Sequence, residues 1–238
     1  MTENPIIVAL DLPPDQALTL ADALRGRVRW LKVGMTLFYA AGPEVVIALK
    51  EKGFDVFVDL KLYDIPHQVS GAAARISRLG AGMLTVHASG GSAMMRAAVE
   101  SSRRAAEEVG MAAPAVLAVT VLTSTGEAGL AEVGVERSPA EQVALLARVA
   151  QEAGVDGVVC SPAEAADMRK LLGDDALVVT PGVRPAWAET GDQQRIATPL
   201  DALVGGASHL VIGRPVTAAA APAEAIARIL AEIEGVTP

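Results

Sequence analysis

Hydrophobic residues along this chain are concentrated in eight short runs, most of them rich in Val, Ile and Leu. Runs of this length without alternating polar positions are typical of strands that are buried on both faces, as in a parallel sheet. The pattern therefore predicts eight strands, at residues 6–10, 30–33, 56–60, 83–87, 115–122, 157–160, 177–180 and 209–212.

Between these runs, apolar residues recur at the three- and four-residue spacing of an amphipathic helix. Several of these segments begin near Pro, Ser or Asp and end at Gly, as helices commonly do. The terminal glycines are Gly26, Gly53, Gly80, Gly110, Gly154 and Gly173. The spacing predicts helices at residues 14–24, 43–52, 69–79, 93–109, 139–153, 163–172, 200–204 and 223–233.

The regular alternation of strands and helices, without a linker, predicts one α/β domain spanning residues 1–238. A closed barrel and an open doubly wound sheet share this pattern, but eight repeats favour the barrel, which typically has about 250 residues. The first strand is followed by Asp11-Leu12-Pro13-Pro14 rather than by a glycine-rich dinucleotide turn, and the sequence has no P-loop. We therefore expect a single-domain (β/α)₈ TIM barrel.

Charged residues lie inside or just after the predicted strands, whose carboxyl ends form the active face of such a barrel. Lys32, Asp59 and Lys61 are embedded in apolar strands, where an unpaired charge would be very costly. Strand alternation places Asp59 and Lys61 on the same side, and Lys32 is their natural third partner. Asp64 follows in the loop. This cluster predicts a catalytic site at the barrel mouth.

A second group of residues predicts a phosphate site. Gly182 and Arg184 follow the seventh strand, and Gly213 and Arg214 follow the eighth. In many barrels a phosphate binds after these two strands, and the planar guanidinium of arginine suits phosphate oxygens. Two long connections, residues 123–138 and 184–199, are expected to be active-site loops.

Composition narrows the range of functions. The chain has 20 basic and 28 acidic residues, a net charge of −8, which argues against nucleic-acid binding. A single cysteine, Cys160, in an apolar run predicts an inert buried thiol and a reducing, cytoplasmic location. We expect neither a signal peptide nor a membrane span, because no basic-then-apolar leader or long uncharged apolar run is present.

Several motifs occur in one order along the chain: ALD (9–11), LKVG (31–34), FVDLKLYDIP (57–66), VLTS (121–124), TPGVRP (180–185), GDQ (191–193) and IGRP (212–215). Together they resemble the orotidine 5′-phosphate decarboxylase family of bacterial type, over nearly the whole chain. The resemblance implies conversion of orotidine 5′-phosphate (OMP) to UMP and CO₂ in pyrimidine biosynthesis. It also implies a homodimer and no metal or organic cofactor.

The resemblance also implies roles for individual residues. Lys61 would protonate a C6 carbanion, within a charged array that also contains Lys32, Asp59 and Asp64, and Asp64 would reach the partner subunit's site. The substrate-binding positions would be Asp11, Lys32, Asp59, Gln68, Thr123, Ser124, Pro181, Arg184, Gln193, Gly213 and Arg214. Gln68 is a departure, because the family commonly has a small hydroxyl residue there.

The main alternative is a Mg²⁺-dependent sugar-phosphate decarboxylase or aldolase of the same superfamily. Such enzymes resemble this chain in the Asp-x-Lys-x-x-Asp strand and the late phosphate site. They typically carry an acidic residue at the position of Lys32, whose ammonium group would repel Mg²⁺. A non-enzymatic nucleotide-binding barrel is a further possibility, against which the charged cluster argues.

Overall fold

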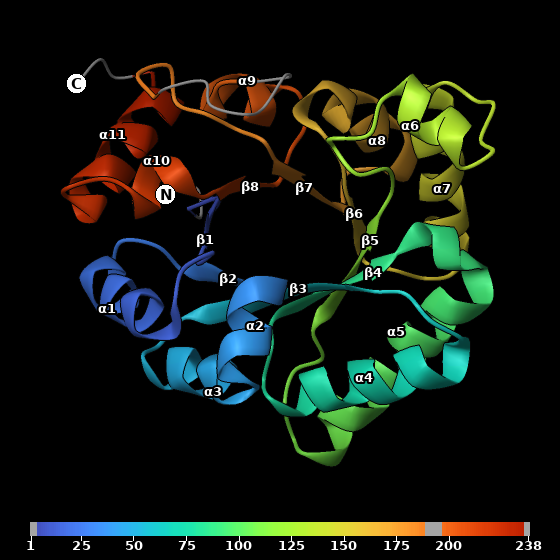
Figure 1. Cartoon of the computed structure of the whole chain (residues 1–238), viewed down its shortest axis with the longest axis horizontal. Coiled ribbons are helices and arrows are strands. Elements are labelled where there is room, and N and C mark those ends of the chain that lie inside the picture. Colours follow the sequence, from blue (N-terminus) through green and yellow to red (C-terminus); the bar gives the residue numbers. More distant parts are fainter. Residues whose placement is uncertain (1–3, 189–196, 236–238) are drawn as a thin grey trace.

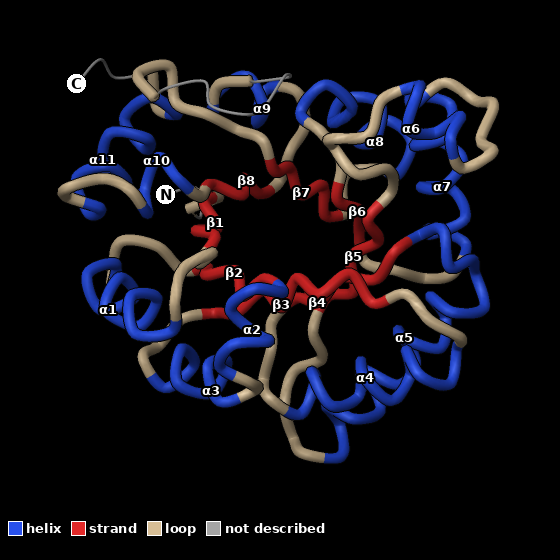
Figure 2. Tube along the Cα trace, viewed as in Figure 1, coloured by secondary structure: helices blue, strands red, loops and turns tan. Residues whose placement is uncertain are grey.

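The structure is a computed structural model that describes residues 4–188 and 197–235. Eight parallel strands pair in sequence order and close into a barrel, and helices surround it (Figures 1 and 2). The strands are β1 (Ile6–Ala9), β2 (Trp30–Gly34), β3 (Asp55–Leu62), β4 (Met83–His87), β5 (Ala115–Val119), β6 (Gly157–Val159), β7 (Leu177–Pro181) and β8 (His209–Ile212). The predicted single-domain (β/α)₈ barrel is confirmed.

The helices cover the outside of the barrel (Figure 2). They are α1 (Pro14–Leu24), α2 (Met35–Ala41), α3 (Glu44–Glu51), α4 (Pro66–Arg78), α5 (Gly91–Glu108), α6 (Glu127–Glu132), α7 (Pro139–Glu152), α8 (Ala165–Leu172), α9 (Pro199–Val204), α10 (Arg214–Thr217) and α11 (Pro222–Ile233), with short 3₁₀ turns η1 (Ala88–Gly90) and η2 (Pro162–Glu164). In the described ranges, no helix is long and apolar enough to cross a lipid bilayer.

Three short helices are absent from the sequence-based prediction. Helix α2 is almost entirely apolar and follows β2 directly, so no polar boundary marks it. Helix α6 lies inside residues 123–138, which were expected to be a loop. Helix α10 has four residues and begins immediately after Gly213. Each is too short to show the periodicity by which a helix is recognised.

Two apolar layers hold the barrel together. Inward-facing residues fill its interior and include Trp30, Phe57 and Leu117. Outward-facing residues of the same strands, such as Val58 and Leu84, pack against the helices. Cys160 is in this outer layer, and burial raises the pKa of its thiol well above the ordinary value, so the thiol stays protonated. Because both faces of every strand are covered, the strands are nearly continuous in apolar residues.

Ion pairs hold the amino-terminal end of the barrel. The Asp55 carboxylate at the start of β3 accepts from Arg29 Nε at 2.6 Å and from Lys50 Nζ at 3.0 Å. Trp30 and His209 stack edge to face nearby, with ring centroids 6.1 Å apart. This arrangement fills the end opposite the predicted site with side chains.

Gly157 is a position where the barrel tolerates no side chain. A Cβ atom there would lie 2.1 Å from the backbone oxygen of Leu177 on the neighbouring strand. The backbone of a closed barrel cannot move aside as a flexible side chain can. The close approach of β6 and β7 therefore depends on this glycine.

We expect Gly157→Ala to lower the free energy of unfolding by about 3 kcal/mol or more, because overpacking against backbone forces the strands apart. Urea denaturation would measure the loss. Gly126→Ala is the matched control, because a Cβ at Gly126 meets no atom within 4 Å and its φ of −98° suits any residue. Equal stability of the two variants would contradict the prediction.

Candidate active site

A cavity of about 380 Å³ lies at the carboxyl ends of the strands. Its lining comes from β1, β2, β3, β5, β6, β7 and β8 and the segments that follow them. Nine predicted site residues line it: Asp11, Lys32, Asp59, Lys61, Thr123, Pro181, Arg184, Gly213 and Arg214. The tertiary structure therefore brings together residues that are separated by as many as 203 positions, from 11 to 214.

Four charged side chains form a continuous chain along one side of this cavity. Lys32 Nζ lies 3.3 Å from Asp11 Oδ1 and 3.6 Å from Asp59 Oδ2. Lys61 Nζ donates to both carboxylate oxygens of Asp59, at 2.9 and 3.0 Å. The order Asp11, Lys32, Asp59, Lys61 alternates in sign, so each charge faces an opposite one, with Asp11 at the exposed end. We call these four residues the charged array.

The array is held at the inner wall of the barrel. The side chains of Lys32 and Asp59 are only 10% and 13% exposed, whereas that of Lys61 is 30% exposed and faces the cavity. Gly34, at the end of β2, leaves room for the first pair. A Cβ there would lie 2.9 Å from both Asp11 Oδ1 and Lys32 Nζ. A larger residue would have to push this ion pair aside.

An irregularity of β3 aims the Asp59 and Lys61 side chains. Val58 pairs with Leu84 of β4, and the next pair is Leu62 with Val86. Between these two pairs, β3 advances by four residues while β4 advances by only two. Residues 59–61 therefore bulge out of the ladder with β4, while Asp59 stays paired with Gly34 of β2. Lys61 has a φ of 50°, which residues other than glycine seldom adopt. The predicted pairing of Asp59 with Lys61 is confirmed, but a bulge produces it rather than simple alternation.

The surroundings of Asp59 determine its ionisation. Burial raises the pKa of this carboxyl, but the charges of Lys32 and Lys61, with hydrogen bonds from Lys61 and Thr85, outweigh it. The net effect holds the pKa below the ordinary value of 3.8. Asp59 is therefore ionised at neutral pH and provides a fixed negative charge between two ammonium groups.

The other end of the cavity is formed by the segments after β7 and β8. Arg184 is 8% exposed, and its backbone N–H donates to Ala197 O at 3.0 Å. The following residues are held against α11, because Arg228 lies over the Trp187 ring at 4.1 Å and Glu232 accepts from Ala186 N. Arginine groups and glycine backbone thus gather at the end where a phosphate site is predicted.

Among the described residues, three predicted site residues do not line the cavity. Asp64, Gln68 and Ser124 are exposed. The Asp64 carboxylate accepts a hydrogen bond from Ile65 N at 2.6 Å, and among the described contacts it forms no ion pair with the array. Asp64 therefore lies apart from the array of its own chain, and its predicted role in the partner subunit's site stays a prediction. Gln193 lies outside the described residues.

Sequence reasoning missed two kinds of site residue. Phe57, Val159 and Val211 form apolar walls of the cavity, and strand alternation from Asp59, Ser161 and Gly213 could have assigned them inward. Thr85 of β4 contacts the array from behind, donating to Asp59 Oδ1 at 3.0 Å. The sequence offered one signal for Thr85: it lies two residues before His87, so strand alternation assigns both side chains to the same face.

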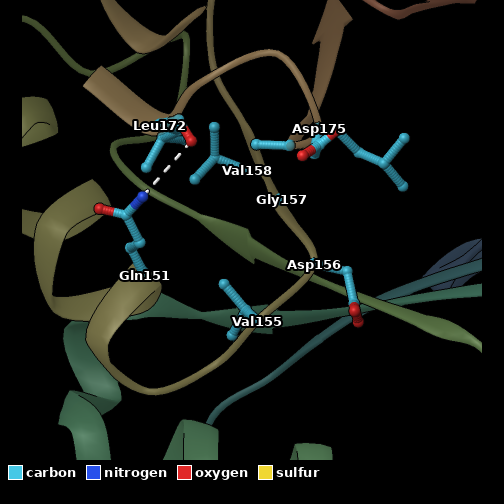
Figure 3. Close-up of a pocket in the computed structure, with 9 residues that line it drawn as sticks. Gln151, Val155, Asp156, Gly157, Val158, Leu172 and Asp175 are labelled. Atoms are coloured by element: carbon cyan, nitrogen blue, oxygen red, sulfur yellow. Dashed lines mark hydrogen bonds between the residues drawn. The ribbon is translucent and has the colours of Figure 1, made fainter.

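A second cavity, of about 430 Å³, lies near the starts of β6 and β7 (Figure 3). Its polar groups are engaged in holding the fold. Gln151 Nε2 donates to Leu172 O at 3.4 Å, and Asp156 Oδ2 accepts from Val116 N at 2.8 Å. The lining of this cavity offers no array of opposed charges.

Comparison with known proteins matches residues 4–229 to the model of the orotidine 5′-phosphate decarboxylase / HUMPS family. The chain belongs to this family. Curated family members named orotidine 5′-phosphate decarboxylase include those of Paramagnetospirillum magneticum and Moorella thermoacetica. Each is 51% identical to this chain. The alignments cover 97% and 98% of this chain and 98% and 93% of the relatives.

A solved structure of the family is also similar throughout. Orotidine 5′-phosphate decarboxylase from Lactobacillus acidophilus is 40% identical, with a TM-score of 0.86, and the match covers 97% of this chain and 99% of that one. The family resemblance predicted from the motifs is therefore confirmed over the full barrel.

We expect Asp59 to make stability depend on pH under acidic conditions. The folded-state pKa lies below 3.8, so between the two pKa values the unfolded chain binds more protons, and stability rises with pH. The contribution is fully present above about pH 4 and is lost as pH falls through the folded-state pKa. Urea unfolding from neutral to strongly acidic pH would measure it.

In this series Asp59→Asn should lose less stability on acidification than the wild type does. Asp167→Asn, at an exposed position of α8, should follow the wild-type slope and serves as the control. Parallel curves for wild type and Asp59→Asn would contradict the assignment.

Proposed function

We propose that this protein decarboxylates OMP to UMP and CO₂ in pyrimidine biosynthesis, without a metal or organic cofactor. The observation that carries the proposal is the charged array, with the Lys61 ammonium held by Asp59 beside the cavity. Relatives with 51% identity over almost their whole length bear the name of this activity.

The cavity has two chemically different ends that suit a nucleoside monophosphate. Arg184, Gly213 and Arg214 would bind the phosphate at one end, together with Gln193. Asp11 and Lys32 would bind the ribose hydroxyls between the ends. Thr123 and Pro181, which line the cavity, would contact the pyrimidine and place its C6 near Lys61. Ser124, which is exposed next to Thr123, would reach the pyrimidine only on substrate binding. A volume of about 380 Å³ is in the range of small-molecule sites.

Lys61 would stabilise the anion that the reaction creates. Loss of CO₂ leaves an electron pair at C6 in the plane of the ring, where the ring system delocalises it little. A cation already fixed next to C6 stabilises this charge without reorganisation. The Lys61 ammonium would then transfer a proton to C6, giving UMP and a neutral amine that solvent reprotonates.

The magnitude of one charge interaction shows that Lys61 cannot act alone. Two unit charges 4 Å apart attract each other by about 4 kcal/mol at an effective permittivity near 20. Binding energy from the distant phosphate must therefore help to hold the base against the array. Asp59 would contribute by keeping Lys61 protonated and oriented, since both its oxygens accept from Lys61 Nζ.

The Mg²⁺-dependent sugar-phosphate activity is the second candidate, and the array argues against it. Two ammonium groups flank Asp59, and they would repel a divalent cation. Among the described residues, no group of three or more His, Cys, Asp or Glu side chains is arranged to hold a metal ion.

We also propose a cytoplasmic location and no nucleic-acid or membrane partner.

We further propose a homodimer in which Asp64 acts in the site of the partner subunit. Tyr63 and Ile65, on either side of Asp64, are each 63% exposed. Tyr39 of α2, at the end of the neighbouring strand, is 78% exposed. Large apolar groups around an exposed carboxylate are better suited to a partner's surface than to water. Gln68 would contact the partner's site as a hydrogen-bond donor.

We expect Lys61→Ala to reduce decarboxylation by about 10³-fold or more, because it removes both the cation and the proton donor. Binding of UMP should change much less, since the phosphate contacts remain. The ultraviolet change from OMP to UMP measures turnover, and calorimetric titration measures UMP binding.

Lys170→Ala, at an exposed position of α8, is the control for loss of a lysine and should match the wild type. Excess EDTA should leave wild-type turnover unchanged. Comparable losses of turnover and UMP binding in Lys61→Ala, or inhibition by EDTA, would count against the proposed chemistry.

The shared site is tested by combining two inactive subunits. Lys61→Ala and Asp64→Asn should each be nearly inactive alone. When the two variants are co-expressed and pair at random, about half of the dimers are hybrids. In each hybrid, one of the two sites has both Lys61 and Asp64, so the total activity should approach about one quarter of the wild-type activity. Separately tagged subunits allow the hybrid to be purified. A hybrid without activity would place Asp64 in the site of its own chain.

A further inference from the structure

Thr85 is a buried polar residue of the barrel interior, next to the charged array. It lies in β4, one strand away from the charged array, and is only 1% exposed. A hydroxyl in such a place is costly unless it is hydrogen-bonded. Its Oγ1 accepts from Lys61 N at 2.9 Å and donates to Asp59 Oδ1 at 3.0 Å.

The direction of both bonds follows from the chemistry of the partners. A backbone N–H can only donate, and an ionised carboxylate can only accept. The Lys61 amide therefore uses a lone pair of the Thr85 hydroxyl, and the single hydroxyl proton goes to Asp59. One side chain thus joins the backbone of Lys61 to the carboxylate that holds the Lys61 ammonium.

Thr85 also occupies the place where the strand ladder is broken. The β3 bulge leaves Thr85 opposite residues 59–61, between the pairs Val58–Leu84 and Leu62–Val86. Lys61 has left-handed backbone geometry there, which costs free energy unless the surroundings fix it. The hydroxyl gives the Lys61 amide the acceptor that the ladder no longer provides.

We propose that Thr85 is a positioning residue for the reaction, which fixes the bulge so that the Lys61 ammonium is presented to the substrate at a set place. It acts through Lys61 and Asp59 and does not itself contact substrate. The proposal rests on the proposed function, because it assumes that Lys61 delivers the proton.

Thr85→Val tests the proposal, because it keeps the branched shape and removes the hydroxyl. We expect kcat to fall by about 10- to 100-fold, as small displacements of reacting groups do, while UMP binding and KM change little. Thr85→Ser retains the hydroxyl and should recover most of kcat. The change in kcat without a change in KM distinguishes positioning from a general loss of the folded site.

Thr120→Val is the matched control. Thr120 is 0% exposed and lies just after β5, and its Oγ1 contacts Val159 O at 3.2 Å, a backbone atom outside the array. Its replacement should lower stability without lowering kcat of the folded protein. Each variant is compared at a temperature where urea unfolding shows that it is fully folded.

If Thr85→Val does not fold, Thr85→Ala and Thr85→Ser decide the same question, since they differ only in the hydroxyl. Similar kcat values for Thr85→Ala and Thr85→Ser would overturn the proposal, and so would a fall in kcat of Thr85→Val no larger than that of Thr120→Val. In either case, turnover of OMP by the wild type would leave the proposed function intact. A wild type that forms no UMP would overturn the proposed function, and this inference with it.

Discussion

The Asp59 carboxylate, held between the ammonium groups of Lys32 and Lys61, is the interaction on which the rest of the site depends. None of these charges would be stable alone inside an apolar barrel, and each is stabilised by the neighbour of opposite sign. Strands β2 and β3 are fixed side by side in a closed ring, and the three charges are already paired with one another with no ligand bound. The electrostatic field is therefore in place before substrate arrives.

The bulge of β3 brings the ammonium group of Lys61 from the paired charges to the cavity. In a regular strand the Lys61 amide would join the ladder. Here it leaves the ladder, Lys61 adopts a rare backbone conformation, and its ammonium group reaches the cavity. Thr85 on the next strand satisfies the displaced amide and bonds the carboxylate as well. The Thr85 hydroxyl thus links the strained backbone of Lys61 to the carboxylate at the centre of the charged array.

In the proposed reaction, the two ends of the cavity would divide the tasks of binding and chemistry. The segments after β7 and β8 supply arginine groups and close backbone, which suit a phosphate, whereas β2 and β3 supply the opposed charges. A rigid barrel fixes the distance between the two ends. In the proposed reaction, binding energy gained at the phosphate would therefore help to hold the base against Lys61.

The sequence by itself determined the eight strands, the helices with clear periodicity, and the closed barrel, because these depend on local spacing and on the number of repeats. It also pointed to Lys32, Asp59 and Lys61, because charges within apolar strands are costly unless they are paired or serve a site, and to Arg184, Gly213 and Arg214, because they follow the last two strands. Asp11, Thr123 and Pro181 were implied only by the resemblance to the family. Only the tertiary structure decided that a bulge aims Lys61, that Thr85 supports it, and that Asp64 lies apart from the array of its own chain. These features arise from register and contacts between strands, and neither composition nor periodicity along a single segment carries that information.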